Sequence, residues 1–316
     1  MGDLLKYRFP GKKNVHKKGE FISLDNLTDY KGFLISSFDK TQFFGFKESD
    51  AKGIISYSIK EPVCYSSEEY SLIAKSFLDE LKDLDLSKAI LSRIEKYNQK
   101  INPEELFELL EKTYPNAFVY LISSSLFGTW IGASPEVLLS EVGGRTNVVS
   151  LAGTKLSDDD SSWGEKEILE QQYVSEFILD KLRLENVKDI FVDGPKDTYA
   201  GPVKHIGTRF SFDSLEDSTV LIDALHPTPA ISGFPQSKAL SLINKHERHE
   251  RFLYAGIIGV KNDESNLYVN LRCTQVQIDT CYIYLGGGFT KDSVVVDEWR
   301  ETKNKAKTLL NIIEKI

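Results

Sequence analysis

The sequence predicts an α+β fold, with largely antiparallel sheets covered by helices. Segments with helical spacing and segments with strand character follow one another irregularly along the 316 residues, without the strict alternation that a parallel sheet requires. No linker rich in Pro, Gly or Ser divides the chain, and 41% hydrophobic residues can build one ample core at this length. We therefore expect one domain over residues 1–316, in which residues 1–66 supply sheet and residues 67–316 carry the motifs.

Composition excludes several classes of function. The chain has 39 Lys and Arg against 47 Asp and Glu, a net charge of −8, whereas nucleic-acid binding needs a concentrated basic face. The apolar runs are too short to cross a bilayer, and the N-terminus shows no apolar signal region. Cys64, Cys273 and Cys281 lack CxxC spacing and fit a reducing compartment. We expect a cytoplasmic protein that binds neither nucleic acid nor membrane.

The first 66 residues predict short strands and carry no recognisable chemistry. Strand character is found in KGFLISSF (31–38), QFFGF (42–46) and GIISYSI (53–59). The basic residues between Lys12 and Lys18 lie in a polar stretch, for which a solvated loop is expected.

The middle of the chain alternates helices and strands. Apolar residues at helical spacing predict a helix over 68–84, and KAILSR (88–93) has strand character. Asn102, followed by Pro103 and two acids, predicts a helix start, and this helix should end near Tyr114. Two strands are expected next, over 117–126 and 129–141, and a third over VVSLAGT (148–154).

The remaining elements are predicted in the same way. A polar loop precedes a long helix over about 164–184, and a strand-like FSF (210–212) comes before two shorter helices. The predicted elements of this part, in order, are helices at 220–225 and 236–246, strands at 254–260, 267–276 and 281–289, and a helix at 297–313.

Three carboxylates are directed inward on two of these helices. Glu170 shares a helix face with the apolar Val174 and Ile178, which should be buried. Glu298 and Glu301 share a face with Lys305 that continues into apolar positions. Buried carboxylates need cations or donors, and glutamates from two helices that meet would suit Mg²⁺. Ordinary exposed ion pairs at a helix start remain the alternative, although the glycines 286–288 just upstream would also favour anionic oxygens.

Taken together, ten segments resemble the chorismate-utilising enzymes, and within them the isochorismate synthases. They occur in the family's order over about the C-terminal three quarters of the chain. The segments are KAILSR (88–93), GASPEVLL (132–139), LAGT (151–154), EKEILEQQYV (165–174), KHIGT (204–208), LHPTPAISGFP (225–235), RFLYAGIIG (251–259), NLRC (270–273), LGGG (285–288) and EWRETKNK (298–305). The family's fold has two stacked antiparallel sheets covered by helices, and its members are monomers by default.

The resemblance implies Mg²⁺-dependent conversion of chorismate to isochorismate, with water added at ring C2 as the C4 hydroxyl leaves. Lys88 matches the general base that activates the water, and Glu136 matches the general acid that protonates the leaving hydroxyl. The first must be a neutral amine and the second a protonated carboxyl near neutral pH. Without the resemblance, Lys88 would be read as a surface lysine and Glu136 as a turn or capping residue.

The resemblance also implies the metal and substrate contacts. Glu170 and Glu301 match the Mg²⁺ ligands, and Glu298 is near enough to bind directly or through water. Arg272, Tyr254 and Lys305 match groups that hold the substrate carboxylates, for which a guanidinium fork is well suited. The remaining positions expected to line the substrate pocket are Ala152, Gly153, Thr154, His205, Ala230 and Gly286. His205 should act as a neutral hydrogen-bonding group.

Two alanines favour one branch of the family. Aminodeoxychorismate synthases carry a nucleophilic lysine where this chain has Ala152, and salicylate synthases and ammonia-using anthranilate synthases typically carry threonine at the position of Ala230. Both alanines indicate water addition without loss of pyruvate. In the metal helix, Glu167 and Gln171 replace the family's Asp and His, a change that can alter metal affinity.

Three other interpretations stay open. The chain could be a salicylate synthase, a catalytically silent chorismate-binding protein on the same scaffold, or an acidic Mg²⁺-binding protein of another role. Ala230 weighs against the first, and the presence of Lys88, Glu136, Glu170 and Glu301 weighs against the second. The sequence does not distinguish menaquinone synthesis from siderophore synthesis as the use of the product.

Overall fold

The strands join edge to edge in one hydrogen-bonded order. This computed structural model describes residues 2–58, 60–200 and 203–316, and within this part the side chains of 154, 166, 200 and 203 are not described. Its sixteen strands run in the order β10-β11-β9-β8-β14-β13-β3-β4-β2-β1-β6-β7-β15-β16-β5-β12, and neighbouring strands are antiparallel. The predicted α+β class is confirmed, and its layers are halves of one continuous sheet.

The elements have the following bounds. The strands are β1 Asp3–Arg8, β2 Val15–Leu24, β3 Gly32–Ser36, β4 Phe43–Glu48, β5 Lys88–Tyr97, β6 Phe118–Ser124, β7 Gly128–Ser134, β8 Val137–Val142, β9 Arg145–Leu156, β10 Phe191–Ala200, β11 Val203–Asp213, β12 Gly233–Phe234, β13 Ile257–Lys261, β14 Asn266–Val269, β15 Cys273–Val276 and β16 Cys281–Phe289. The helices are α1 Ser67–Asp83, α2 Pro103–Thr113, α3 Glu165–Leu184, α4 Thr219–Leu225, α5 Gln236–His246 and α6 Val295–Ile313.

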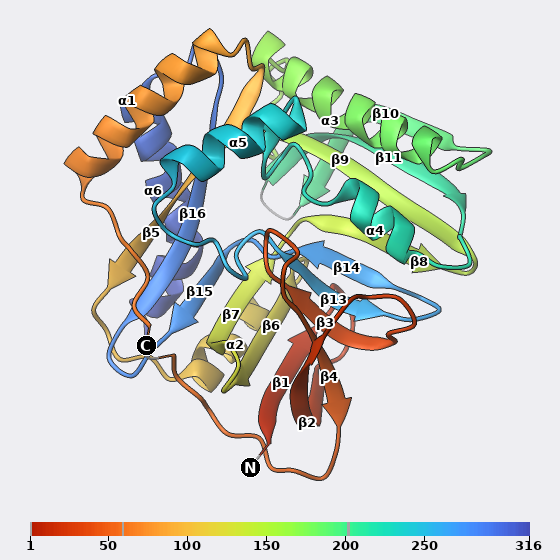
Figure 1. Cartoon of the computed structure of the whole chain (residues 1–316), viewed down its shortest axis with the longest axis vertical. Coiled ribbons are helices and arrows are strands. Elements are labelled where there is room, and N and C mark those ends of the chain that lie inside the picture. The colour runs from red at the N-terminus through yellow and green to blue at the C-terminus, as the bar shows by residue number, and fades with distance from the viewer. Residues whose placement is uncertain (1, 59, 201–202) are drawn as a thin grey trace.

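Helices cover the two halves of the sheet in separate groups (Figure 1). Helices α1 and α5 pack on β5 through one apolar cluster, which includes Phe77, Leu91 and Leu242. Helices α2 and α6 pack on β6, β7 and β16 through a second cluster, and α3 and α4 join the main core beside β8, β9 and β11. Helices α1 and α5 therefore cover the end of the strand order near β5, and α3 and α4 cover the end near β9 and β11.

The helix starts follow local chemistry. The side chain of Asn102 accepts hydrogen bonds from the backbone N–H groups of Glu104 and Glu105, as predicted for the start of α2. Ser66 and Glu69 form a reciprocal capping box at the start of α1. Because these caps satisfy N–H groups that lack partners within the helix, they fix where each helix begins.

Two strands that the sequence predicts as continuous are broken. The predicted strand over 129–141 stops at Ser134 and resumes at Val137, and the one over 267–276 stops at Val269 and resumes at Cys273. Arg272 in the second break has φ +51°, a left-handed conformation that ends a strand. The breaks place Glu136 and Arg272 outside the ladder, free of the strand's alternation.

The prediction for the N-terminal region was partly wrong. Residues 54–58 form no strand. Lys12 and Lys13 lie in the predicted loop, but the rest of the basic stretch belongs to residues 15–24, which form β2 between β1 and β4. The polar residues His16, Lys18 and Glu20 occupy exposed positions of this strand. Because most residues of this strand are polar, its sequence shows little of the alternation of apolar and polar residues that is typical of a half-buried strand.

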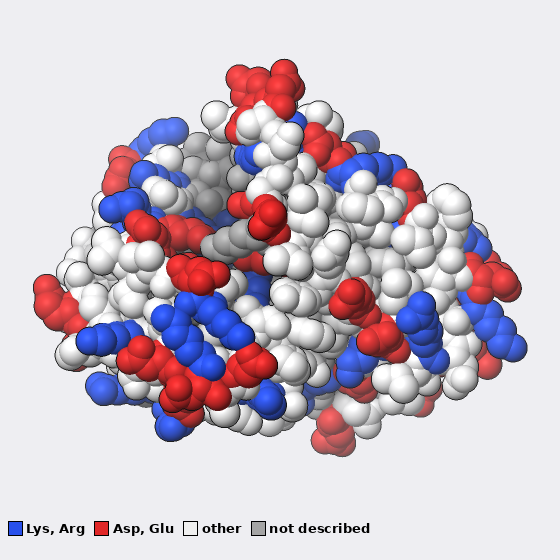
Figure 2. Space-filling view, turned by 90° about the horizontal axis from the view of Figure 1, so that it is seen from above, with Lys and Arg blue, Asp and Glu red and all other residues white. Residues whose placement is uncertain are grey.

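The surface agrees with the charge balance. On the face shown in Figure 2, Lys and Arg side chains are interspersed with Asp and Glu rather than gathered in one basic area. Among the described residues, the helices are too short or too polar to traverse a lipid bilayer. Cys64, Cys273 and Cys281 are free thiols.

Candidate active site

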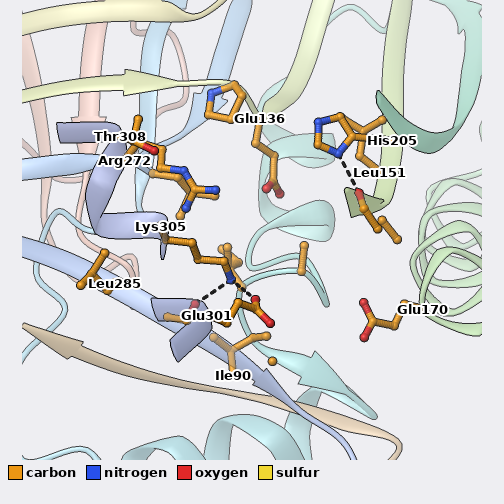
Figure 3. A pocket seen from close by; sticks show the side chains of 18 of the residues that line it. Ile90, Glu136, Leu151, Glu170, His205, Arg272, Leu285, Glu301, Lys305 and Thr308 are labelled. Atoms are coloured by element: carbon orange, nitrogen blue, oxygen red, sulfur yellow. Dashed lines mark hydrogen bonds and ion pairs between the residues drawn. The ribbon is translucent and has the colours of Figure 1, made fainter. Parts of the chain in front are cut away.

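A cavity of about 620 Å³ lies between strands from opposite ends of the order. One wall comes from β5, β16 and α6, and the other from β9, β11 and α3 (Figure 3). The predicted residues that line it are Lys88, Glu136, Ala152, Gly153, Glu170, His205, Ala230, Tyr254, Arg272, Gly286, Glu301 and Lys305. Residues more than two hundred positions apart in the chain thus meet in one space.

Lys88 is the first residue of β5, and its side chain contacts Glu170 of α3 inside the cavity. Its Nζ lies 3.2 Å from Glu170 Oε2, and both side chains are mostly buried. The neighbouring strand supplies Gly288, where an added Cβ would lie 3.1 Å from Lys88 Cε. A larger residue there would displace the lysine, so the third glycine of the LGGG segment keeps space for its side chain.

Glu136 lies in the break between β7 and β8, and its carboxylate points into the cavity (Figure 3). Thr228 Oγ1 donates a hydrogen bond of 3.5 Å to Glu136 Oε1, and the backbone carbonyl of Glu136 accepts from Val269 N–H. Burial raises the pKa of Glu136, although Lys88 and Arg272 act in the opposite direction. The surroundings therefore favour the protonated carboxyl more than water would.

Three polar side chains of the cavity, those of Arg272, Lys305 and Tyr254, can bind the carboxylates of a ligand. Burial lowers the pKa of Arg272 and that of Lys305, and it raises the pKa of Tyr254. An added Cβ on Gly286 would lie 2.9 Å from the Tyr254 hydroxyl, so the glycine gives that hydroxyl room. Figure 3 shows the side chains of Arg272 and Lys305 on the same side of the cavity, across from Glu136.

Helix α6 contributes Lys305 and Glu301 to the cavity but directs Glu298 elsewhere. Lys305 Nζ donates to the backbone carbonyl of Gly286 at 2.8 Å and lies 2.6 Å from Glu301 Oε1. Glu298 is buried, and its Oε1 accepts a hydrogen bond of 2.7 Å from Ser293 Oγ. Its carboxylate lies behind Gly287 and is not part of the cavity wall. The expectation that both glutamates of this helix reach one site therefore does not fit this geometry, because three residues of helix turn them about 60° apart.

The residues of β9 and β11 that line the cavity are Leu151, Ala152, Gly153 and His205, and none is an acid, a lysine or an arginine. Gly153 has φ +62°, and an added Cβ would lie 2.8 Å from the Trp163 ring. His205 Nδ1 donates to the Gly153 carbonyl at 2.7 Å, which fixes the ring in place. Thr154 belongs to β9, but its side chain lies outside the described residues.

Glu167 lines the cavity as well, one helical turn before Glu170. The sequence singles it out only as a departure from the family's metal helix, so its place in the wall was missed. Gln171, the other departure, is buried and donates to Thr208 Oγ1 at 2.6 Å. Gln171 therefore ties α3 to β11 instead of facing the cavity.

The donors in the cavity fit a hard cation such as Mg²⁺. Glu170 and Glu301 offer oxygen ligands from two helices, and Mg²⁺ commonly takes one or two protein carboxylates with water or substrate oxygens. In this structure Glu170 is paired with Lys88, and Glu301 is paired with Lys305. Within the described residues, groups of three or more His, Cys, Asp and Glu side chains in a ready metal-binding arrangement are absent.

Comparisons with known proteins identify the family of this chain. A family model described as chorismate binding enzyme matches residues 34–314. Isochorismate synthase EntC of Escherichia coli (strain K12) is 30% identical over 244 residues, which are 72% of this chain and 62% of that protein. Anthranilate synthase component 1 of Mycolicibacterium smegmatis is 26% identical over 267 residues, which are 78% of this chain and 51% of that protein. The chain thus spans less than two thirds of the length of these curated relatives.

Solved structures share the fold. MenF of Escherichia coli, the menaquinone-specific isochorismate synthase, superposes with a TM-score of 0.83 at 17% identity, covering 98% of this chain and 88% of that one. DhbC from Bacillus anthracis gives a TM-score of 0.80 at 23% identity, covering 99% and 96%. With the family match over most of its length and the cavity described above, the chain belongs to the family of chorismate-binding enzymes.

Proposed function

We propose that this protein is an isochorismate synthase, which converts chorismate to isochorismate with Mg²⁺. The observation that carries the proposal is the placement of Lys88 and Glu136 in one cavity, together with Ala152 and Ala230. A base and an acid of the required types thus face one space, and the two alanines leave room for water. Relatives of both the isochorismate and the anthranilate synthase type are similar to this chain, so the alanines carry the choice between branches.

The chemistry divides its proton transfers between two residues. Lys88, as a neutral amine, takes a proton from water as the oxygen bonds to ring C2 and the ring double bonds shift. The C4–O bond breaks, and Glu136 gives its proton to the departing hydroxyl, which leaves as water. One water enters and one leaves, so the product is an isomer, and a proton returned from Lys88 to Glu136 through solvent resets the site.

Three cationic or hydroxyl groups would hold the substrate. Arg272 and Lys305 would bind its carboxylates, and Tyr254 would donate a hydrogen bond beside them. A Mg²⁺ ion held by Glu170 and Glu301 would supply Lewis-acid chemistry toward the ring carboxylate. Arg272 and Lys305 are partly buried, so their attraction for a dianionic substrate is stronger than it would be in open solvent.

The direct test is incubation of the purified protein with chorismate, with and without Mg²⁺, followed by chromatography and a pyruvate assay. Isochorismate formed only with Mg²⁺ and without pyruvate is the expected result. Salicylate together with pyruvate would assign the protein to the salicylate synthases. An absence of conversion would leave a chorismate-binding protein without catalysis.

Replacing Glu301 by Gln should weaken the Mg²⁺ dependence. The amide keeps the shape but loses the charge, so the Mg²⁺ concentration for half-maximal turnover should rise on the order of 10-fold or more. A thermal-shift titration with Mg²⁺ alone gives a second readout. Glu314→Gln, at the exposed end of the same helix, is the matched control. An unchanged Mg²⁺ titration for Glu301→Gln would make α6 structural only.

Replacing Ala230 by Thr should shift the products toward pyruvate and salicylate. The residue lines the cavity, and the threonine places a hydroxyl beside the ring where the resembling salicylate synthases have one. Ala230→Val has the same shape without the hydroxyl and serves as the control. If the product ratio is identical in Ala230→Thr, Ala230→Val and the wild type, position 230 does not choose the branch.

A further inference from the structure

A buried ion pair lies directly behind the cavity without lining it. Glu247 and Arg251 follow α5, and their side chains are only 4% and 3% exposed. Arg251 Nε donates to Glu247 Oε2 at 2.9 Å, and Nη2 donates to Oε1 at 2.7 Å, a two-bond pairing of guanidinium and carboxylate. Burial opposes the ionisation of Glu247, but Arg251, together with His249 and the Ser92 N–H, lowers the pKa of the carboxyl below its usual value.

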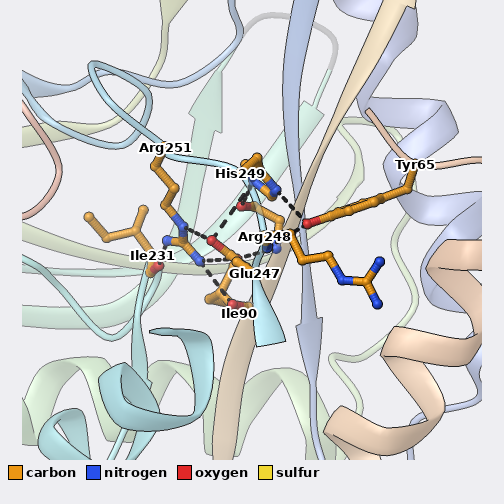
Figure 4. A network of polar contacts seen from close by, with 8 residues as sticks. Tyr65, Ile90, Ile231, Glu247, Arg248, His249 and Arg251 are labelled. Carbon is orange, nitrogen blue, oxygen red and sulfur yellow. Dashed lines mark hydrogen bonds and ion pairs between the residues drawn. The ribbon is translucent and has the colours of Figure 1, made fainter. Parts of the chain in front are cut away.

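Arg251 also binds the backbone of two residues that do line the cavity. Its Nη1 donates to the Ile231 carbonyl at 2.6 Å, and its Nη2 donates to the Ile90 carbonyl at 2.9 Å. Ile90 lies two residues after Lys88 on β5, and Ile231 directly follows Ala230. One guanidinium therefore joins the strand that carries Lys88 to the segment that carries Ala230 (Figure 4).

Glu247 fixes the same strand at a second point. Its Oε1 accepts a hydrogen bond of 2.6 Å from Ser92 N–H, and His249 Nε2 lies 2.8 Å from Ser92 Oγ. His249 Nδ1 is in turn 3.1 Å from the Tyr65 hydroxyl. Strand β5 is thus held at Ile90 and Ser92, the positions on the same side of the strand as Lys88.

Stability alone does not explain this pair. Replacing a buried ion pair by apolar residues is often neutral or stabilising, because desolvating two charges is costly. Here the hydrogen bonds of the pair end on backbone groups of β5 and of the segment at Ile231. The backbone pairing described between these segments is short, two residues of β12 with β5 and the bonds beside it. The pair is placed where it controls the spacing of these two segments.

We propose that Arg251 and Glu247 are positioning residues, which set the distance between Lys88 and the ring-facing segment at Ala230. The inference rests on the proposed function, because it assigns the pair to the geometry of that reaction. Arg251 would act through Ile90 and Ile231 and would not touch the substrate. Its loss should therefore lower kcat more than it changes the KM for chorismate, since Arg272 and Lys305 lie on other segments.

The test compares Arg251→Lys with Arg248→Lys. A lysine at 251 keeps the charge near Glu247 but cannot bridge two carbonyls and a carboxylate, whereas Arg248 is exposed and its side chain points away from the network (Figure 4). We expect kcat to fall on the order of 10²-fold in Arg251→Lys, with near-wild-type KM and circular dichroism, and to stay unchanged in Arg248→Lys. A folded Arg251→Lys enzyme with wild-type kcat would overturn the proposal.

Two further measurements keep the test decisive. A second cavity of about 220 Å³ lies beside Arg251, so guanidinium ion added to Arg251→Ala should restore turnover several-fold, and an equal concentration of urea should not. If the position 251 variants do not fold, Tyr65→Phe loosens the same network more mildly, and an unchanged kcat in it would reject the proposal. If the wild-type protein does not convert chorismate, the proposed function has failed. If the wild type converts chorismate and the variants have the same kcat, the positioning role has failed and the proposed function stands.

Discussion

Replacing Glu136 by Gln is expected to lower chorismate turnover by about 10²- to 10⁴-fold, the usual contribution of a general acid. The amide has nearly the same shape, so it fits between Thr228 and the cavity, but it has no proton to give to the leaving hydroxyl. Binding of chorismate with Mg²⁺, measured by calorimetry, should remain close to that of the wild type. Near-normal turnover in Glu136→Gln would remove this residue from the acid role.

The same residue should shape the pH profile. Burial raises the pKa of Glu136, and the acid role needs the protonated form. The fraction of enzyme with Glu136 protonated is therefore largest below this raised pKa, and Glu136 should cause kcat to fall as pH rises through it. Glu136→Asp keeps an acid on a shorter side chain, so it should retain part of the turnover and the falling limb at high pH.

Replacing Lys88 by Met should cost about 10²- to 10⁴-fold in turnover as well, because methionine fills similar space but cannot take a proton from water. Glu170 also loses its ammonium partner, so Mg²⁺ should bind at least as tightly as in the wild type. The measurements are steady-state kinetics and a Mg²⁺ thermal-shift titration.

Lys96→Met is the matched control, because Lys96 lies on the same strand with a partly exposed side chain paired to Glu61. Its turnover should equal that of the wild type. Turnover within a few-fold of normal in Lys88→Met would show that another group activates the water.

Much of the fold follows from local patterns, and the misses have physical causes. The cap at Asn102 and the apolar spacing in α3 and α6 predict these helices within about two residues. Strand β10 was missed because FVDGPKDTYA is polar and contains Pro195, which is tolerated there since β10 is an edge strand of the sheet. An edge strand pairs with a neighbour on one side only, so a residue without an N–H group can face the unpaired side.

The site shows a different limit. The motif residues meet in one cavity, but the breaks at Glu136 and Arg272 were missed, because each lies inside a segment with strand character. Pro135 is a signal that could have marked the first break, since proline is disfavoured inside a central strand. Glu298 and Glu301 share a helix face by spacing, yet the glycine strand lets only Glu301 reach the cavity. The pair of Glu247 and Arg251 has no local signature, because its partners Ile90 and Ile231 are remote in the chain.

The cavity walls belong to opposite ends of the strand order, from β9 and β11 on one side to β5 and β16 on the other. Its residues run from Lys88 to Thr308, so a fragment that ends before α6 lacks an essential part of it. Contacts between such distant segments form late in folding, because long loops must close first. The cavity is therefore a late product of folding, and it is complete only after α6 has docked on β16.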